Sequence, residues 1–99
     1  MRILFVFLFL FFSSSLLVQA QKPFVVLLDA GHGGKDPGKV ARNYIEKDIA
    51  LNIVLIAKKK LKEIDGIEVV YTRQKDVFIE LKQRGKIAND ANGDLFVSV

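Results

Sequence analysis

The 99-residue sequence contains no cysteine and only one histidine, His32. Without cysteine the chain cannot form a disulfide scaffold, a thiol nucleophile or a cysteine-ligated zinc finger. The excess of positive over negative charge is small as well. Because Arg2 is the only charged residue before position 21, residues 21–99 carry 14 Lys and Arg against 11 Asp and Glu, a net charge of +3. So small an excess does not indicate nucleic-acid binding, and 79 residues exclude a second domain.

Residues 1–20 have the pattern of a secretory signal peptide. Arg2 supplies a short positive region, residues 3–12 are an unbroken apolar run, and Val18-Gln19-Ala20 forms a cleavage site after Ala20. A retained membrane anchor is the alternative, but a run of ten is shorter than the roughly 20 residues of a spanning helix. We therefore expect export to the periplasm or extracellular envelope of a bacterium, without stable membrane anchoring after cleavage.

The mature chain has the hydrophobic pattern of alternating strands and helices. Apolar runs predict strands over residues 24–29, 67–72 and 95–99. Helical periodicity predicts one helix over residues 46–64 and a second that ends near Asn92-Gly93. The order β-α-β-α-β predicts an α/β fold with a mostly parallel sheet and flanking helices. Because the chain stops inside an apolar strand, we expect residues 21–99 to be the N-terminal part of a larger domain.

Each predicted helix has a face that should contact the sheet. In the first helix this face comprises Ile49, Ile53, Ala57, Leu61 and Ile64. Asn43 and Glu46 resemble a capping box at the helix start, and Asp65-Gly66 supplies the stop. In the second helix Gly85 shares the apolar face, which predicts a close approach to the sheet.

A glycine-rich loop, residues 29–38, follows the first strand at the sheet edge where open α/β folds bind ligands. A Rossmann fingerprint would need glycine in place of Asp36. A P-loop would need Ser or Thr after Lys35 and glycine in place of Asp29, so neither phosphate motif is present.

His32 and Glu46 remain as candidates for chemistry. A lone histidine is usually a structural hydrogen-bonding residue, but the glycines around His32 have no side chains to pack against it, which favours metal ligation or acid–base chemistry. Glu46 alone would be interpreted as a helix-start carboxylate. If the loop folds back over the sheet edge, the two residues meet and supply two of the three protein ligands of a catalytic zinc site.

The chain resembles the zinc-dependent N-acetylmuramoyl-L-alanine amidases of bacterial cell walls, in order and with compatible spacing. The resemblance is carried by DAGHGGKDPG at 29–38, EKDIALNIVLIAKKKL at 46–61, EVVYTR at 68–73, ELKQRGKIAND at 80–90 and DLFVSV at 94–99. It implies an α/β catalytic domain that binds Zn²⁺ and hydrolyses the amide between N-acetylmuramic acid and L-alanine in peptidoglycan. Cell-division or envelope regulators are the implied protein partners.

By this resemblance His32 matches the first zinc ligand and Glu46 the second. The family's third ligand, a histidine, would follow Ser98-Val99, and its catalytic glutamate would lie further on, so we assign no catalytic residue within the 99 and expect this fragment alone to be inactive. Asp29, Arg73, Arg84 and Asn89 also match recurrent family positions, and we interpret them as supports of the loop and helix. Glu80 departs from the small or capping residue common at that position.

Two other functions stay open at this point. One is a zinc hydrolase of the same fold with another amide substrate. The other is a catalytically degenerate amidase-like domain that binds the wall or regulates a partner. The residue after Val99 discriminates best between them, because histidine would favour an enzyme.

The leader generates the first prediction. We expect cleavage between Ala20 and Gln21, because the apolar run is short and a small-residue site follows it. N-terminal sequencing of the exported protein checks this. A mature form that begins at Met1 and stays in the membrane fraction would contradict it.

Overall fold

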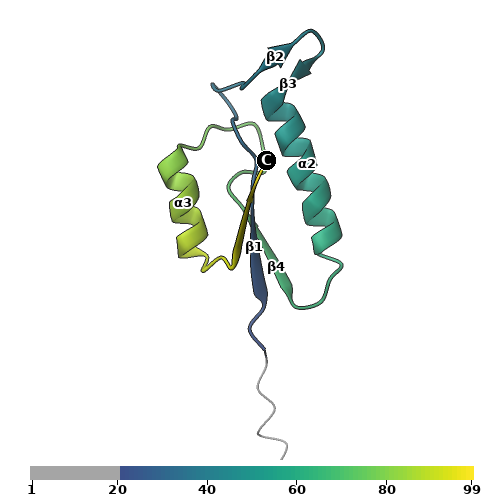
Figure 1. Cartoon of the computed structure of the whole chain (residues 1–99), viewed down its shortest axis with the longest axis vertical. Helices are drawn as coiled ribbons and strands as arrows, with labels where there is room; N and C mark the ends of the chain where they lie inside the picture. The colour runs from purple at the N-terminus through teal and green to yellow at the C-terminus, as the bar shows by residue number, and fades with distance from the viewer. Residues whose placement is uncertain (1–20) are drawn as a thin grey trace, which may run out of the picture.

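The computed structural model describes residues 21–99, so the signal-peptide prediction lies outside the described residues. Along the chain the elements are β1 (Phe24–Asp29), β2 (Val40–Ala41), β3 (Tyr44–Ile45), α2 (Glu46–Leu61), β4 (Ile67–Tyr71), α3 (Leu81–Asp90) and β5 (Leu95–Ser98) (Figure 1). Within residues 21–99, no helix combines the length and apolarity needed to cross a membrane.

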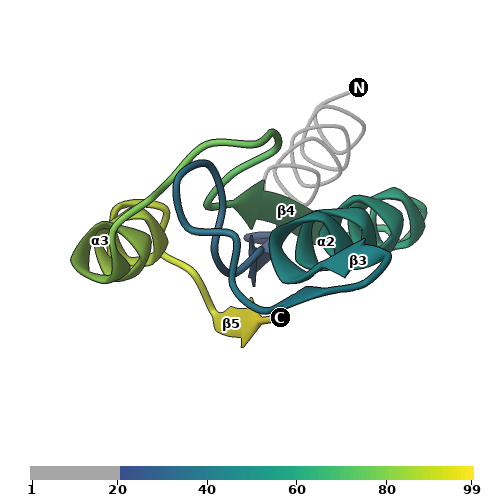
Figure 2. The ribbon, with the colours of Figure 1, turned by 90° about the horizontal axis from the view of Figure 1, so that it is seen from above.

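Three parallel strands form the main sheet, in the order β4-β1-β5. The chain runs from β1 through α2 to the neighbour on one side, and then through α3 to the neighbour on the other. Figure 2 shows that the two helices lie on opposite faces of this sheet. The α/β prediction with a mostly parallel sheet is confirmed. The C-terminal end of β1 is where the chain order reverses, which is where open α/β sheets bind their ligands.

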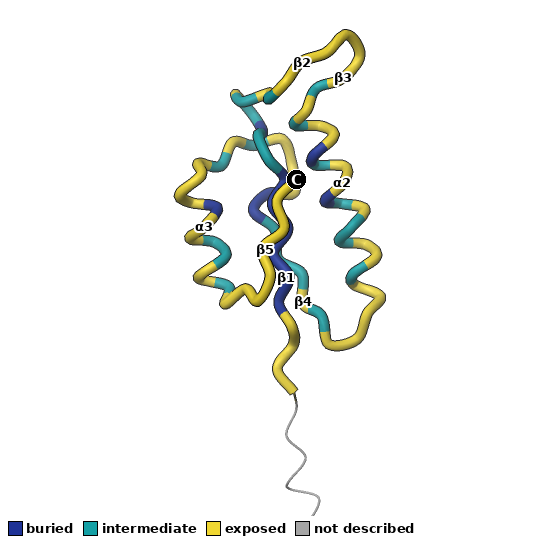
Figure 3. Tube along the Cα trace, viewed as in Figure 1, coloured by how far each residue is buried: buried dark blue, intermediate teal, exposed yellow. Residues whose placement is uncertain are grey.

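The core lies between β1 and α2, and β1 is the most deeply buried element (Figure 3). Val26 and Leu28 of β1 pack with Ala50 and Val54 of α2, while Leu27 is fully buried on the opposite face of the strand. Each buried valine or leucine side chain stabilises the fold by roughly 1.5–3 kcal/mol through removal from water. This packing fixes the position of the loop that leaves β1 relative to the start of α2.

The predicted sheet-facing stripe of α2 is wrong at Ile49 and Ile53, in the first half of the helix, where the buried residues lie one position later. Ala50 and Val54 are buried, whereas Ile49 and Ile53 remain 44% and 45% exposed. Since each helix residue rotates the side chain by about 100°, the two sets lie on adjacent faces. Both sets are apolar, so periodicity alone could not choose between them. Ala57 and Leu61, which belong to the predicted stripe, do pack against the core.

The predicted capping box is also wrong, because a short hairpin precedes α2. Asn43 lies in the turn between β2 and β3, whose residues pair antiparallel. The helix begins at Glu46 without a side-chain cap. Its first amide groups donate instead to loop carbonyls, from Glu46 N to Lys39 O over 2.9 Å and from Lys47 N to Pro37 O over 3.1 Å. The carboxylate of Glu46 is therefore free for other contacts.

Helix α3 faces the sheet with a different residue than predicted. A Cβ atom added to Gly85 would meet no atom within 4 Å, and Leu81 is 86% exposed, so the predicted close approach does not occur. The buried side chain of α3 is Arg84. Glu80 is the N-cap residue of α3, and its side chain makes no capping hydrogen bond.

Asp29, the last residue of β1, ties the ends of all three strands together. Its buried carboxylate accepts hydrogen bonds from Thr72 Oγ1 (2.8 Å), Ser98 Oγ (2.6 Å) and Arg84 Nη1 (2.8 Å). Burial alone would raise the pKa of Asp29, but the hydrogen bonds from Ser98, Arg84 and Thr72 outweigh it and hold the pKa below its ordinary value of 3.8.

We expect Asp29→Asn to destabilise the full-length protein by about 3–5 kcal/mol at pH 7, because it removes the counter-charge of a buried guanidinium. The native pKa is depressed, so the stabilisation by the Asp29 carboxylate exists above pH 3.8 and disappears as the pH falls through the native pKa. The variant should therefore lose less stability on acidification. Denaturant unfolding at pH 7 and pH 3 measures both effects.

Asp90→Asn is the matched control, since Asp90 pairs with Lys86 on an exposed face of α3. We expect this change to cost less than about 1 kcal/mol. Equal losses in the two variants would contradict the role given to Asp29.

Candidate functional site at the end of strand β1

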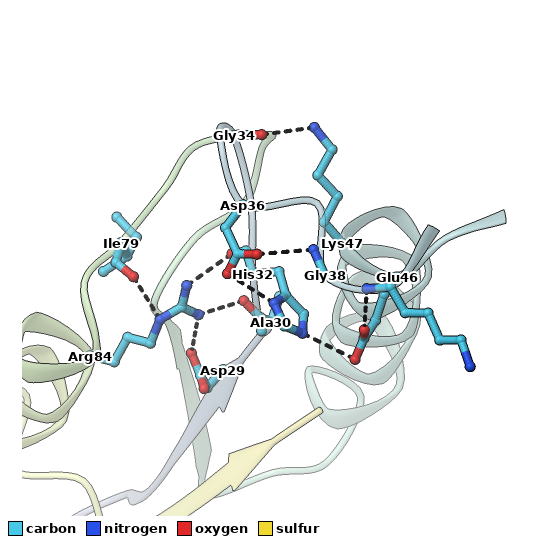
Figure 4. Close-up of polar contacts among 12 residues, drawn as sticks. Asp29, Ala30, His32, Gly34, Asp36, Gly38, Glu46, Lys47, Ile79 and Arg84 are labelled. Atoms are coloured by element: carbon cyan, nitrogen blue, oxygen red, sulfur yellow. Dashed lines mark hydrogen bonds and ion pairs between the residues drawn. The ribbon is translucent and has the colours of Figure 1, made fainter. Parts of the chain in front are cut away.

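The loop after β1 depends on left-handed backbone at several positions. His32 has φ 59°, and Gly33, Gly34 and Gly38 also have positive φ. Backbone hydrogen bonds between Gly33 and Asp36, of 2.8 and 3.0 Å, close a tight turn. A left-handed histidine is uncommon, and here it turns the imidazole toward the start of α2 (Figure 4).

Two buried arginines hold the inner part of this loop by its carbonyl groups. Arg73 donates to Ala30 O (2.9 Å), Gly31 O (2.8 Å) and Lys47 O (2.9 Å). Arg84 donates to Ala30 O (2.7 Å) and His32 O (2.9 Å). Together with Asp29, these contacts confirm the predicted supporting roles of Arg73 and Arg84.

Asn89 does not share that role in the part of the chain that the structure describes. Its side chain is exposed, and its backbone carbonyl accepts a hydrogen bond from the amide of Asn92 at the end of α3. The similarity of Asn89 to a recurrent family position therefore has no counterpart in the loop contacts.

A second set of contacts holds the outer part of the loop. The amide of Gly34 donates to Asp76 Oδ1 over 2.7 Å. Lys47 Nζ donates to Asp76 Oδ2 over 2.9 Å and to Gly34 O over 3.1 Å. The hydrogen bond from Lys47, and then that from the Gly34 amide, lower the pKa of Asp76. The loop is thereby attached to the first turn of α2.

The structure brings together the two predicted site residues, His32 and Glu46. Nε2 of His32 lies 3.0 Å from Oε1 of Glu46, while Oε2 of Glu46 accepts a hydrogen bond from the amide of Lys39 over 2.7 Å (Figure 4). Both side chains are partly exposed. The loop after β1 and the first residue of α2 thus place an imidazole nitrogen and a carboxylate oxygen side by side.

Asp36 is a third member of the site that the sequence pattern did not predict. Its Oδ2 lies 2.9 Å from Nδ1 of His32, and its Oδ1 accepts the amide of Gly38 over 3.0 Å. A signal was available in the sequence: a carboxylate four residues after the histidine, inside a run of glycines that had to form a turn. As a single residue, Asp36 enters the sequence argument only as a departure from a nucleotide-binding motif.

The charges of the site follow from these contacts. The hydrogen bond that His32 makes to Asp36 raises the pKa of His32 above its ordinary value; burial opposes this shift, and the contact with Glu46 adds to it. The pKa of Asp36 is lowered by its contacts with His32 and Gly38. That of Glu46 is lowered by the Lys39 amide and then by His32. Two ionised carboxylates therefore flank one imidazole at neutral pH, an environment that attracts a cation.

The donor atoms present fit a zinc ion in kind and in spacing. Two ligand atoms on one tetrahedral zinc ion lie roughly 3–3.5 Å apart, and Nε2 of His32 is 3.0 Å from Oε1 of Glu46. Within residues 21–99, no group of three His, Asp or Glu side chains converges on one point. The described residues thus offer two ligand atoms.

The site opens into a pocket of about 500 Å³. Its polar lining includes His32, Asp36 and Glu46, and Phe78 and Leu81 contribute apolar surface. Its position at the C-terminal end of β1 agrees with the ligand-binding edge predicted from the sequence.

Comparison with known proteins decides the family. Residues 26–99 match the family model described as N-acetylmuramoyl-L-alanine amidase. The chain belongs to this family. The resemblance to N-acetylmuramoyl-L-alanine amidases noted in the sequence is confirmed.

Individual relatives show the same similarity. The chain is 52% identical over 75 residues to an endolysin of Bacillus phage SPP1, covering 76% of this chain and 28% of the endolysin. It is 38% identical over 79 residues to the N-acetylmuramoyl-L-alanine amidase AmiC of Escherichia coli O6:H1, covering 79% and 19%. The chain therefore spans less than a third of the length of these relatives.

Solved structures extend the similarity to the fold. The catalytic domain of CwlV, an N-acetylmuramoyl-L-alanine amidase from Bacillus (Paenibacillus) polymyxa var. colistinus, superposes with a TM-score of 0.74 at 45% identity, covering 76% of this chain and 43% of that one. An N-acetylmuramoyl-L-alanine amidase from Clostridium difficile 630 superposes with a TM-score of 0.76 at 38% identity, covering 79% and 43%.

Gly38 packs against both candidate site residues. A Cβ atom at this position would lie 2.7 Å from Glu46 Oε2 and 2.7 Å from His32 Cδ2, and the residue has φ +65°. Glycine is therefore required at position 38 both by the left-handed backbone conformation and by the closeness of the His32 and Glu46 side chains.

We expect Gly38→Ala to destabilise the full-length protein by about 1–3 kcal/mol, through left-handed strain and displacement of the His32–Glu46 pair. The control is Gly85→Ala, where a Cβ meets open space inside a helix. That change should stabilise by about 0.5–1 kcal/mol. Thermal unfolding of both variants provides the comparison, and a Gly38→Ala protein as stable as wild type would contradict the tight packing.

Proposed function

We propose that the protein containing this chain is a zinc-dependent N-acetylmuramoyl-L-alanine amidase. It hydrolyses the amide between the lactyl group of N-acetylmuramic acid and L-alanine of the stem peptide in peptidoglycan. The pairing of His32 Nε2 with Glu46 Oε1 at the ligand edge of the sheet carries this proposal, because it offers two zinc-ligand atoms at one point. The match to the N-acetylmuramoyl-L-alanine amidase family supports the same reaction.

His32 and Glu46 would hold the zinc ion. When bound, zinc polarises the scissile carbonyl and lowers the pKa of a water ligand toward neutrality. His32 presents the lone pair of Nε2, and Glu46 presents Oε1 while Oε2 stays fixed by the Lys39 amide. Arg73 and Arg84 hold the loop carbonyls, so the imidazole keeps its place without relying on the metal. Asp36 already contacts His32 and Gly38, and we give it no proton-transfer role.

The pocket beside the pair is suited to an extended polar substrate. It is partly open to solvent, and both polar groups and the apolar side chain of Phe78 line it. A glycan strand with its peptide could lie across the sheet edge with the amide directed to His32 and Glu46. We further propose that the protein is exported and acts on the bacterial cell wall, as the names of its relatives and the predicted leader support.

The test uses the full-length protein and two variants. We expect His32→Ala to lose most bound zinc and nearly all release of dye from labelled cell walls. Glu46→Gln should lose less zinc, because a neutral oxygen ligand remains. Elemental analysis of purified protein gives the metal content, and thermal unfolding shows that the variants fold.

Lys82→Ala is the matched control, since Lys82 is exposed on α3. It should keep its metal and its activity. A His32→Ala protein that retains full zinc would refute the ligand assignment. Zinc binding by the wild type without wall hydrolysis would favour the binding or regulatory function instead.

A further inference from the structure

The imidazole of His32 lies between two carboxylates, one at each ring nitrogen. Asp36 Oδ2 is 2.9 Å from Nδ1, and Glu46 Oε1 is 3.0 Å from Nε2. A neutral imidazole has one N–H group, so it can donate to one of these carboxylates only. The two acidic residues therefore compete for the position of a single proton.

The outcome of this competition decides whether His32 can bind a metal. If the proton is on Nε2, it points at Glu46 and occupies the atom that must bind zinc. If it is on Nδ1, it points at Asp36, and the Nε2 lone pair faces Glu46 and the pocket. Metal-binding histidines commonly donate their other N–H group to a carboxylate or carbonyl, which fixes the tautomer and the ring orientation.

Asp36 is held in place independently of Glu46. Its backbone forms both hydrogen bonds of the turn with Gly33, and its Oδ1 accepts the Gly38 amide. The turn therefore presents Oδ2 to Nδ1 as part of the loop itself. Glu46 belongs to α2, and its Oε1 is free to contact a cation instead of the ring.

We propose that Asp36 is a positioning residue that keeps the proton of His32 on Nδ1 and so directs the Nε2 lone pair toward the metal. This inference rests on the proposed function, because it takes His32 as a zinc ligand. Asp36 acts through His32 and is not itself assigned as a zinc ligand.

The decisive variant is Asp36→Asn in the full-length protein, which keeps the size and one oxygen of the side chain. An amide nitrogen cannot accept a hydrogen bond from Nδ1, and if it faces the ring it donates to Nδ1 and places the proton on Nε2. If the amide oxygen faces the ring instead, the amide nitrogen opposes the Gly38 N–H group. We expect zinc affinity to fall about 10- to 100-fold, measured by titration against a chelator of known affinity.

The control variant is Asp76→Asn. Asp76 also anchors the loop, by accepting the Gly34 amide at 2.7 Å, but it makes no contact with the imidazole in the described structure. It should reduce stability to a similar degree in thermal unfolding and leave zinc affinity near that of wild type. The pair separates general loosening of the loop from loss of the contact to Nδ1.

A second readout does not depend on affinity or activity. Long-range ¹H–¹⁵N spectra of the histidine rings, assigned with His32→Ala, should show the Nδ1–H form of His32 in zinc-loaded wild type and in Asp76→Asn. The zinc-free Asp36→Asn protein above the His32 titration range should show more of the Nε2–H form than zinc-free wild type.

Unchanged zinc affinity and unchanged tautomer in Asp36→Asn would overturn the inference, as would an equal loss of affinity in Asp76→Asn. If the His32→Ala variant binds zinc as tightly as wild type does, the proposed ligand assignment is overturned, whatever the result for Asp36→Asn.

Discussion

The buried carboxylate of Asp29 is the contact on which the rest of the site depends. It joins the ends of β1, β4 and β5 through Thr72 and Ser98, and it neutralises Arg84 of α3. Arg84 can then extend its guanidinium to the carbonyls of Ala30 and His32. The backbone conformation of His32, and with it the direction of the imidazole, therefore depends on the buried carboxylate of Asp29, three residues earlier in the chain.

Charge explains why the glycine loop must be ordered. Arg73 and Arg84 are both buried, and Asp29 is the one buried carboxylate among the described residues. Burial, and then the nearby charge of Arg84, lower the pKa of Arg73. Backbone carbonyls of the loop and of Lys47 supply the remaining acceptors. A loop that moved away would leave buried guanidinium groups without partners, which is costly. The loop and the arginines thus stabilise each other.

The sequence predicted the three strands of the main sheet, both helices and the His32–Glu46 pair, because these follow from hydrophobic runs and from a histidine without packing neighbours, but it did not predict the β2–β3 hairpin. It did not predict the face of α2, since Ile49 and Ala50 begin two adjacent apolar stripes and only packing against β1 selects one. It also misassigned Glu46 to a capping box. Propensity cannot show that the loop carbonyls of Pro37 and Lys39 receive the first helix amides and release that carboxylate. Asp36 was missed because its role depends on the left-handed turn at His32.

Release of Glu46 from helix capping connects the fold to the chemistry. A carboxylate at the first position of α2 would ordinarily interact with the helix dipole, and here its Oε2 is held by the Lys39 amide from the loop. Its Oε1 consequently has a fixed direction toward His32. Asp36 is fixed in the same way, with Oδ1 on the Gly38 amide and Oδ2 on the ring. In each carboxylate one oxygen is anchored to the backbone of the loop and the other is presented to the imidazole. The glycine loop thereby determines the geometry of both acids, and Gly38, placed between His32 and Glu46, sets how closely they approach.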